Sequence, residues 1–380
     1  MKELKEIIKA FDEAQSHGKQ TALATVVHVE GSSYRRAGAR MLVTEDGELT
    51  GAISGGCLEG DALRKAQLVM FKQKSMLVTY DTTGEDDAKF GVGLGCNGII
   101  HILIEPIDPG DKVHPIQFLK EFFSKRENTV LVTLFSMKNK SDEQPGTCLF
   151  LNSNGKVSGS FNDNSLEKIL IDDAKEALAN HSLLTKVYRD EDELTGFVEL
   201  LKPPVSLIVF GAGNDAIPLT DMANILGWET TIVDGRANHA TAERFPKAGK
   251  IIVSKPEDAM LRLSPDARTA AILMTHNYNY DLAMLKQLIP MRIPYIGALG
   301  PKKRTDQMVD ELQQEGVSLS DNQLQHLYGP VGLNIGAETS EEIALSIFAE
   351  IKAVFSGKPG SHLREKEEPI HDRESTVIVH

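Results

Sequence analysis

The sequence predicts an α/β protein: its C-terminal part is a doubly wound parallel sheet, and its N-terminal part is an α+β domain with an internal duplication. The first observation is that short runs apolar on both faces alternate with helical stretches after residue 204, as in VSLIVF, TTIVD, KIIVS, TAAILM and IPYIGAL. Such runs are typical of parallel strands that helices cover on both sides. The second observation is that the preceding chain repeats itself. The third is a glycine-rich turn at the end of VSLIVF.

The first residues, MKELKEIIKAFDEAQ, predict an amphipathic helix rather than a signal peptide, because Leu4, Ile7, Ile8 and Phe11 recur at helical spacing among charges. The 380 residues carry 41 basic and 54 acidic side chains, and this net charge of −13 argues against nucleic-acid partners. No apolar run approaches the roughly 18 residues of a membrane helix. The three cysteines form no Cys-x-x-Cys pair, so we expect a cytoplasmic protein with free thiols.

The N-terminal repeat has an offset of 108 residues. Residues 21–60 lie without a gap on residues 129–168, with eight identities in 40. MLVTEDGELTGAI and LFLNSNGKVSGSF each predict two short strands around a tight turn, followed by a helical segment. We expect four parts: a first α+β unit, a degenerate second copy of it, the doubly wound domain and a polar tail, over residues 1–110, 111–202, 203–356 and 357–380.

Differences between the copies point to function, because a scaffold requirement should survive in both copies, whereas a site requirement need survive in only one. An arginine cluster and two glycine-flanked cysteines occur in the first copy alone. These residues are Arg35, Arg36, Arg40, Gly55, Gly56, Cys57 and Cys96.

Cys57 is the leading thiol and the candidate metal ligand. A thiol beside arginines would have a lowered pKa, and it could bind a soft metal or carry sulfur. The alternative is a small buried residue in a glycine turn. Cys148 replaces Arg40 in the second copy, and we expect it only to pack. No set of cysteines and histidines has the spacing of a zinc site.

The dinucleotide-binding fingerprint follows VSLIVF as Gly211-x-Gly213-x-x-Ala216. The glycines allow a tight turn and close approach of a phosphate, and the N-terminus of the next helix offers free N–H groups. This pattern predicts a Rossmann-like domain with a phosphate-bearing ligand. Asp234, at the end of the next strand, either holds a ribose hydroxyl or caps the turn that follows it.

Further candidates follow later strands of this domain, where ligands of open α/β sheets bind. His276 is either a structural hydrogen-bonding group or a part of the site. A cationic helix start at Lys302 and Lys303 opposes the helix dipole, so it favours a bound anion, with a solvated basic face as the alternative. The remaining candidates in these loops are Asn214, Thr275, Gly297 and Gly300.

The segments GSSYRRAGARMLV, GAISGGCLEGDA, GLGCNG, VFGAGN, YIGALGPKKR and GPVGLNIGAETSEEIALSIFAEI resemble the xanthine dehydrogenase accessory factor family (XdhC/CoxI). The resemblance implies a chaperone that binds molybdenum cofactor (molybdopterin), protects it during sulfuration and delivers it to xanthine dehydrogenase or a related molybdenum hydroxylase. It implies that Cys57, and next Cys96, contacts cofactor or sulfur. The fingerprint, His276 and residues 297–304 would form a second part of the site. A cysteine desulfurase is a further expected partner, and a homodimer is the default assembly.

Three residues depart from the family pattern, which usually has proline at Tyr34, glycine at Asn97 and histidine at Asn214. Two other functions stay open at this point. One is an NAD(P)-dependent oxidoreductase with His276 as acid or base, and the other is a stable non-catalytic subunit of a dehydrogenase. Our hypothesis is that the Rossmann-like domain holds the phosphate of the pterin, and that the first copy supplies arginines and a thiol near the metal.

Overall fold

The computed structural model describes residues 1–82, 98–140, 142–159, 163–189 and 191–367. The chain divides into two compact units. We call residues Glu3–Pro203 the duplicated unit, and residues Pro204–Glu367 together with Met1 and Lys2 the parallel-sheet unit.

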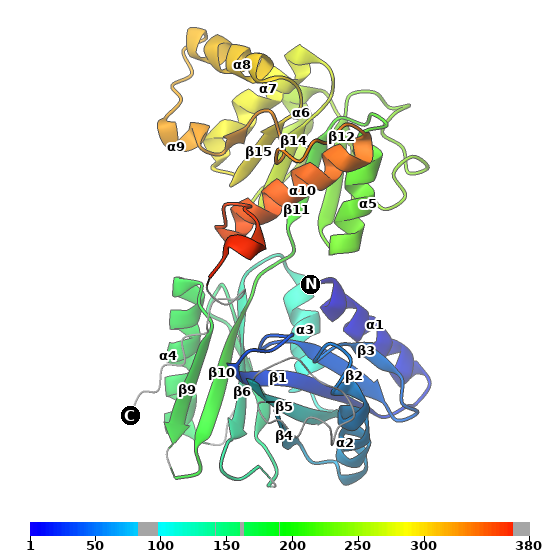
Figure 1. Cartoon of the computed structure of the whole chain (residues 1–380), viewed down its shortest axis with the longest axis vertical. Helices are drawn as coiled ribbons and strands as arrows, with labels where there is room; N and C mark the ends of the chain where they lie inside the picture. Colours follow the sequence, from blue (N-terminus) through cyan, green and yellow to red (C-terminus); the bar gives the residue numbers. More distant parts are fainter. Residues whose placement is uncertain (83–97, 141, 160–162, 190, 368–380) are drawn as a thin grey trace. The chain divides into compact units, whose positions relative to one another are not determined.

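The duplicated unit contains two five-stranded antiparallel sheets with the same strand order, β3-β2-β1-β5-β4 and β8-β7-β6-β10-β9 (Figure 1). The offset of 108 residues carries β3 onto β8 and β4 onto β9, residue for residue. The predicted duplication is therefore confirmed, while its boundary at residues 110 and 111 stays a prediction. The strands are β1 (Thr21–Gly31), β2 (Arg40–Thr44), β3 (Leu49–Gly51), β4 (Met76–Asp81), β5 (Gly98–Ile107), β6 (Thr129–Ser136), β7 (Gly146–Asn152), β8 (Val157–Gly159), β9 (Leu184–Arg189) and β10 (Leu194–Leu201).

One helix covers the outer face of each sheet. Helix α2 (Glu59–Lys72) packs Ala62, Ala66 and Val69 against the first sheet, and α4 (Asn164–Asn180) packs Leu170 and Ala174 against the second. The other two helices of the unit are α1 (Lys2–Ser16), amphipathic as predicted, and α3 (Pro115–Ser124).

The inner faces of the two sheets share a small apolar core. Its buried members are Val27, Leu77 and Leu103 from the first sheet and Phe135 and Phe197 from the second. Because side chains alternate between the faces of a strand, these residues point away from the two helices. The layers therefore run α2, first sheet, second sheet, α4, with the helices on opposite sides of the unit (Figure 1).

The parallel-sheet unit has one six-stranded sheet in the order β13-β12-β11-β14-β15-β16, and every neighbouring pair is parallel. The chain builds outward from β11, returns to the centre and continues from β14, which is the order of a Rossmann fold. The predicted fold class is confirmed. The strands are β11 (Ser206–Phe210), β12 (Glu229–Asp234), β13 (Lys250–Val253), β14 (Thr269–Leu273), β15 (Tyr295–Ala298) and β16 (Leu327–Tyr328).

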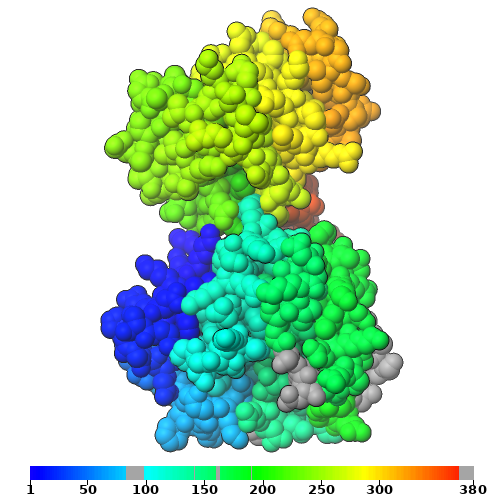
Figure 2. Space-filling view, turned by 180° about the vertical axis from the view of Figure 1, so that it is seen from behind, coloured from blue at the N-terminus to red at the C-terminus, as the bar shows by residue number. Residues whose placement is uncertain are grey.

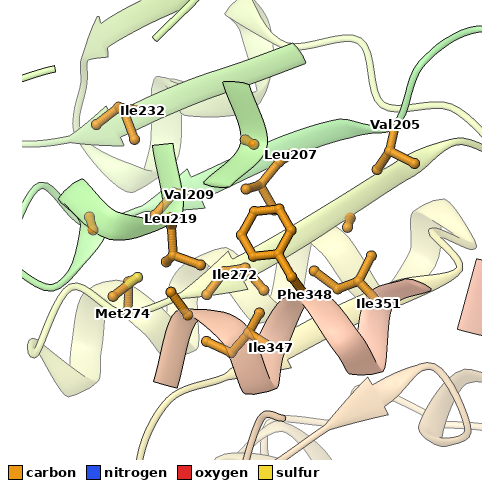
Figure 3. Close-up of a cluster of buried hydrophobic side chains, with 14 of the residues drawn as sticks. Val205, Leu207, Val209, Leu219, Ile232, Ile272, Met274, Ile347, Phe348 and Ile351 are labelled. Carbon is orange, nitrogen blue, oxygen red and sulfur yellow. The ribbon is translucent and has the colours of Figure 1, made fainter. Parts of the chain in front are cut away.

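Helices cover both faces of this sheet, which explains the runs that are apolar on both faces. Figure 3 shows Ile347, Phe348 and Ile351 of α10 pointing toward the strand residues Leu207 and Ile272. On the other face, α7 and α8 complete a second core. The helices are α5 (Ala216–Leu226), α6 (Pro256–Ala259), α7 (Tyr278–Leu288), α8 (Lys302–Gln314), α9 (Asp321–Leu324) and α10 (Ser340–Ser356), with 3-10 turns at Met260–Arg262, Ile289–Met291 and Leu363–Glu365.

Within the described ranges, no helix is long and apolar enough to cross a membrane.

Candidate functional site

The glycine-rich turn lies between β11 and α5, where the two halves of the parallel sheet diverge and where Rossmann folds bind ligands. Gly211 has a φ of +128°. A Cβ atom on it would lie 2.4 Å from the carbonyl oxygen of Met274. Glycine is therefore required here by the close approach of the chain that leaves β14.

Three consecutive backbone N–H groups of this turn are free. Those of Gly213, Asn214 and Asp215 donate to no group in the described part of the chain, whereas the N–H of Ala212 donates to Asp234 Oδ2 at 2.7 Å. They stand just before α5, whose N-terminal end carries the positive end of the helix dipole. A run of free N–H groups at this position is suited to an anion such as phosphate.

Asp234 caps the turn after β12, which is the second of its two predicted roles. Its buried carboxylate accepts hydrogen bonds from the N–H of Ala212 and from the N–H, Nε and Nη2 of Arg236. Burial opposes ionisation, but these hydrogen bonds prevail and hold the pKa of Asp234 below its ordinary value. A ribose hydroxyl would have to displace Arg236 to reach it.

Arg244 clamps the glycine-rich turn. Its Nη1 donates to the carbonyl oxygens of Ala212 at 2.6 Å and His239 at 2.7 Å, and its Nη2 donates to Asn214 Oδ1 at 2.8 Å. The amide of Asn214 is thus held by an arginine that no local motif indicates. Arg236 and Arg244 add positive charge beside the free N–H groups.

His276 lies next to this turn. Its Nε2 is 2.7 Å from Asp215 Oδ2, and the other oxygen of Asp215 is buried without a hydrogen-bond partner in the described residues. The backbone of His276 is left-handed, with a φ of +59°, which is unusual for a residue other than glycine. Its side chain is 64% exposed, so a ligand at the turn could reach the imidazole.

Thr275, in contrast, is committed to the scaffold. It is buried, and its hydroxyl donates to Asp281 Oδ1 at 2.7 Å. Asp281 is fully buried and also accepts from Arg304 Nη2 at 2.6 Å. The expectation that Thr275 binds cofactor does not fit this placement, because its polar atoms hold the turn after β14.

The loop after β15 contains one scaffold residue and two available cations. Gly297 is buried inside β15, and a Cβ on it would lie 2.6 Å from a methyl group of Val331, so its role is packing rather than ligand contact. Gly300 forms the turn with a φ of +122°. Lys302 and Lys303 are exposed in the first turn of α8, without an ion-pair partner among the described residues. These lysines remain candidates for an anion.

The Cys57 loop is organised around Ser54 and Glu59. The Ser54 hydroxyl donates to Glu59 Oε2 and accepts from the N–H groups of Gly56 and Leu58. Although burial opposes it, hydrogen bonds from Ser54 and from the backbone lower the pKa of Glu59. The half-buried Cys57 sulfur is 3.5 Å from Ser54 Oγ. The loop therefore presents a thiol from a hydrogen-bonded frame.

The three arginines of the first copy do not cluster. Arg35 pairs with Glu3, and Arg36 is exposed with no ion-pair partner among the described residues. Arg40 is 1% exposed and lies between the two sheets, where Nη1 and Nη2 bind the carboxylate of Glu199. The prediction that Arg40 contacts cofactor is therefore revised to a structural role, because its guanidinium has no exposed surface.

Tyr34 joins the arginine loop to the Cys57 loop. Its ring lies 3.5 Å from the position of a Cβ on Gly55, and the side chain remains 69% exposed. Glycine at position 55 lets the aromatic ring lie against the backbone. Arg36 and Cys57 thus belong to two loops in contact.

Two family models match the chain: the XdhC Rossmann domain over residues 207–351, and the XdhC and CoxI family over residues 14–81. A Bacillus subtilis protein whose name describes it as a probable subunit of xanthine dehydrogenase is 34% identical over 334 residues, which are 88% of this chain and 92% of that protein. The chain belongs to the XdhC/CoxI family.

Two further relatives agree with this membership. The Escherichia coli protein named molybdenum cofactor insertion chaperone PaoD is 24% identical over 348 residues, 92% of this chain and 87% of that protein. A crystal structure described as a xanthine dehydrogenase from Bacillus halodurans aligns with a TM-score of 0.75 and 33% identity, covering 94% of this chain and 98% of that one.

In this XdhC/CoxI protein, Cys96 and Asn97 lie outside the described residues. Cys148 packs in the core of the second copy, where burial raises the pKa of its thiol to about 12. Among the described residues, no group of three or more His, Cys, Asp and Glu side chains could hold a metal ion.

Sequence reasoning missed a polar cluster on the inner face of the first sheet. His28 and His101 stack, and His101 is 3.3 Å from Glu30 and 3.0 Å from Thr79. Burial lowers the pKa of His101 to about 4. A usable signal was present, because the second copy has Ser136, Lys138 and Thr195 at the positions of His28, Glu30 and His101.

Proposed function

We propose that this protein binds molybdenum cofactor, assists its sulfuration and inserts it into a molybdenum hydroxylase of the xanthine dehydrogenase type. The observation that carries the proposal is the run of free N–H groups at Gly213, Asn214 and Asp215, beside an Asp234 that Arg236 already satisfies. This arrangement suits a phosphate without a neighbouring ribose. The phosphate of a pterin cofactor meets that description, and the relative named PaoD supports the same cargo.

The parallel-sheet unit would hold the phosphate. Backbone N–H groups need no conformational change to donate to it, and Lys302 and Lys303 would add positive charge at the same edge of the sheet. His276 would donate a hydrogen bond from its exposed imidazole. Arg244 would act through the loop it clamps rather than by contact.

The duplicated unit would supply Cys57. A thiolate is a ligand that suits soft metals and sulfur chemistry, and Cys57 is half-buried in a loop fixed by Ser54 and Glu59. The exposed Arg36 would favour the thiolate and an anionic cofactor. In this proposal a cysteine desulfurase supplies the sulfur, the carrier is cytoplasmic, and it acts as a homodimer.

The strand order and the glycine-rich turn also favour a second candidate, an NAD(P)-dependent oxidoreductase with His276 as acid or base. That candidate requires a ribose contact at the end of β12, where Asp234 is already satisfied. A non-catalytic subunit, which the name of the Bacillus subtilis relative suggests, would bind its dehydrogenase at fixed stoichiometry.

The test is anaerobic cofactor retention. The purified protein is mixed with molybdenum cofactor and desalted, and the pterin in the protein fraction is oxidised and measured by fluorescence, with Cys57→Ala and the buried-thiol control Cys148→Ala alongside. We expect near-stoichiometric pterin in the wild type and in Cys148→Ala, and a loss in Cys57→Ala. Equal retention by all three would remove Cys57 from the site. An absence of pterin throughout, together with fluorescence enhancement of bound NADH, would favour the oxidoreductase.

A further inference from the structure

The outer face of α2 exposes a large apolar side chain that the fold does not need. Phe71 is 85% exposed and Leu68 is 36% exposed, and the two lie one turn apart on the same side of the helix. The opposite side already packs Ala66 and Val69 on the sheet. Residues near 70, medium blue in Figure 2, form part of the surface of the duplicated unit.

The second copy shows that this exposure is specific to the first. The offset of 108 residues places Glu176 at the position of Leu68 and Ala179 at that of Phe71. The buried side is preserved in character, with Ala174 at the position of Ala66. A scaffold requirement is therefore met on the inner side of both helices, whereas the outer side of α2 differs as a binding surface would.

The charges around Phe71 differ between the copies as well. α2 carries Arg64, Lys65 and Lys72, and the second copy has Asp172, Asp173 and Asn180 at these positions. Arg64 pairs with Asp61 of its own helix, and Lys74, just beyond the helix, pairs with Glu143. Lys65 and Lys72 have no ion-pair partner in the described part of the chain.

This basic rim stands out in a protein with a net charge of −13. Basic residues around an exposed aromatic residue fit a partner surface in which carboxylates surround an apolar pocket. Charge complementarity thus indicates an acidic partner.

A second copy of this chain does not fit as that partner. The acidic α4 would complement α2, but α2 and α4 lie on opposite outer layers of the duplicated unit. Contact between α2 of one molecule and α4 of the next would be head-to-tail, and such contacts build open chains rather than closed dimers. The favoured partner is therefore a different protein.

We propose that the outer face of α2, centred on Phe71 and Leu68 and rimmed by Lys65 and Lys72, docks the cofactor-free molybdenum hydroxylase through an acidic surface with an apolar pocket. The identity of this partner rests on the proposed function. Phe71 would be the anchor that the partner buries, and the lysines would steer association.

The test measures binding of the full-length protein to purified, cofactor-free xanthine dehydrogenase by biolayer interferometry at two salt concentrations. The variants are Phe71→Ser, the double variant Lys65→Glu/Lys72→Glu, and the control Ile169→Ser, which removes a 47% exposed apolar side chain from α4. We expect Phe71→Ser to weaken binding by about tenfold or more. The double variant should slow association chiefly at low salt, and the control should bind like the wild type.

Equal binding by Phe71→Ser and Ile169→Ser would overturn the proposal, and so would an absence of wild-type binding. Concentration-dependent self-association that Phe71→Ser abolishes would also overturn it, because the occupant would then be a second copy. The double variant keeps the test valid if Phe71→Ser fails to fold. Pterin retention is measured in parallel: the proposed function fails if the wild type retains no pterin, and this inference fails if Phe71→Ser does not affect binding.

Discussion

Removing the Glu199 carboxylate should destabilise the duplicated unit strongly, because it would leave Arg40 charged and buried. The Arg40 side chain is 1% exposed and that of Glu199 is 12% exposed. Arg40 Nη1 also donates to the carbonyl oxygen of Gly38 at 3.0 Å, and its Nε has no hydrogen-bond partner in the described residues. The guanidinium therefore depends on Glu199 for most of its compensation.

The expected magnitude follows from this burial. Removing one partner of a buried ion pair costs about 3–5 kcal/mol, whereas an exposed pair contributes roughly 0–1 kcal/mol. The Lys19–Asp46 pair, whose side chains are 31% and 44% exposed, is the exposed comparison. We predict a loss of about 3–5 kcal/mol in Glu199→Ala. Most of that stability should return in the apolar double variant Arg40→Met/Glu199→Leu.

The assay is urea unfolding followed by far-UV circular dichroism and by tryptophan fluorescence. The single tryptophan, Trp228, lies in the parallel-sheet unit, so its transition serves as an internal reference. Glu199→Ala should lower the free energy of unfolding seen by circular dichroism, with Asp46→Ala close to the wild type. A loss below about 1 kcal/mol in Glu199→Ala would refute the account of Arg40 as a buried structural cation.

Three further predictions follow. Burial raises the pKa of Glu105 above its unfolded value, so its contribution to stability is full below the unfolded pKa and is lost as pH rises through the folded pKa; Glu105→Gln should reduce the fall in the free energy of unfolding over this window, and an unchanged pH profile would contradict this. Gly211→Ala should lose more than about 2 kcal/mol by Trp228 fluorescence, against roughly 1 kcal/mol in Gly316→Ala, which has a positive φ but open space around it; similar losses would remove the steric argument. Asp215→Asn should bind inorganic phosphate roughly fivefold more tightly by calorimetry, because a carboxylate no longer competes for the free N–H groups; Asp221→Asn on the same helix is the control, and weaker binding by Asp215→Asn would contradict this prediction.

The duplication could be predicted from the sequence because glycine positions and strand periodicity are local features. Gly51 and Gly159 both approach a carbonyl oxygen of the neighbouring strand, that of Arg40 in one copy and of Cys148 in the other. The same backbone contact therefore preserves a glycine in both copies. The Rossmann fold was predictable for a related reason, since its fingerprint and its strands adjoin each other in the chain.

The role of Arg40 could not be predicted from its neighbours in GSSYRRAGAR. Strand β2 begins at Arg40, and alternation places Met41 toward α2 but Arg40 toward the second sheet. Its partner Glu199 is 159 residues away. Only the packing of the two copies brings them together.

The pairing of His276 with Asp215 also depends on tertiary structure. The sequence indicated that both the glycine-rich turn and His276 follow central strands, so their proximity could be expected. The free N–H groups and the clamp by Arg244 could not, because they depend on which hydrogen bonds the turn itself makes.

Transfer of the cofactor to its enzyme tests the central claim most directly. The protein is loaded anaerobically with molybdenum cofactor, mixed with cofactor-free xanthine dehydrogenase, and compared with the same amount of free cofactor by the xanthine-oxidising activity recovered. We predict faster and more complete recovery from the loaded protein than from free cofactor. Recovery no greater than with free cofactor would contradict the proposed role in insertion.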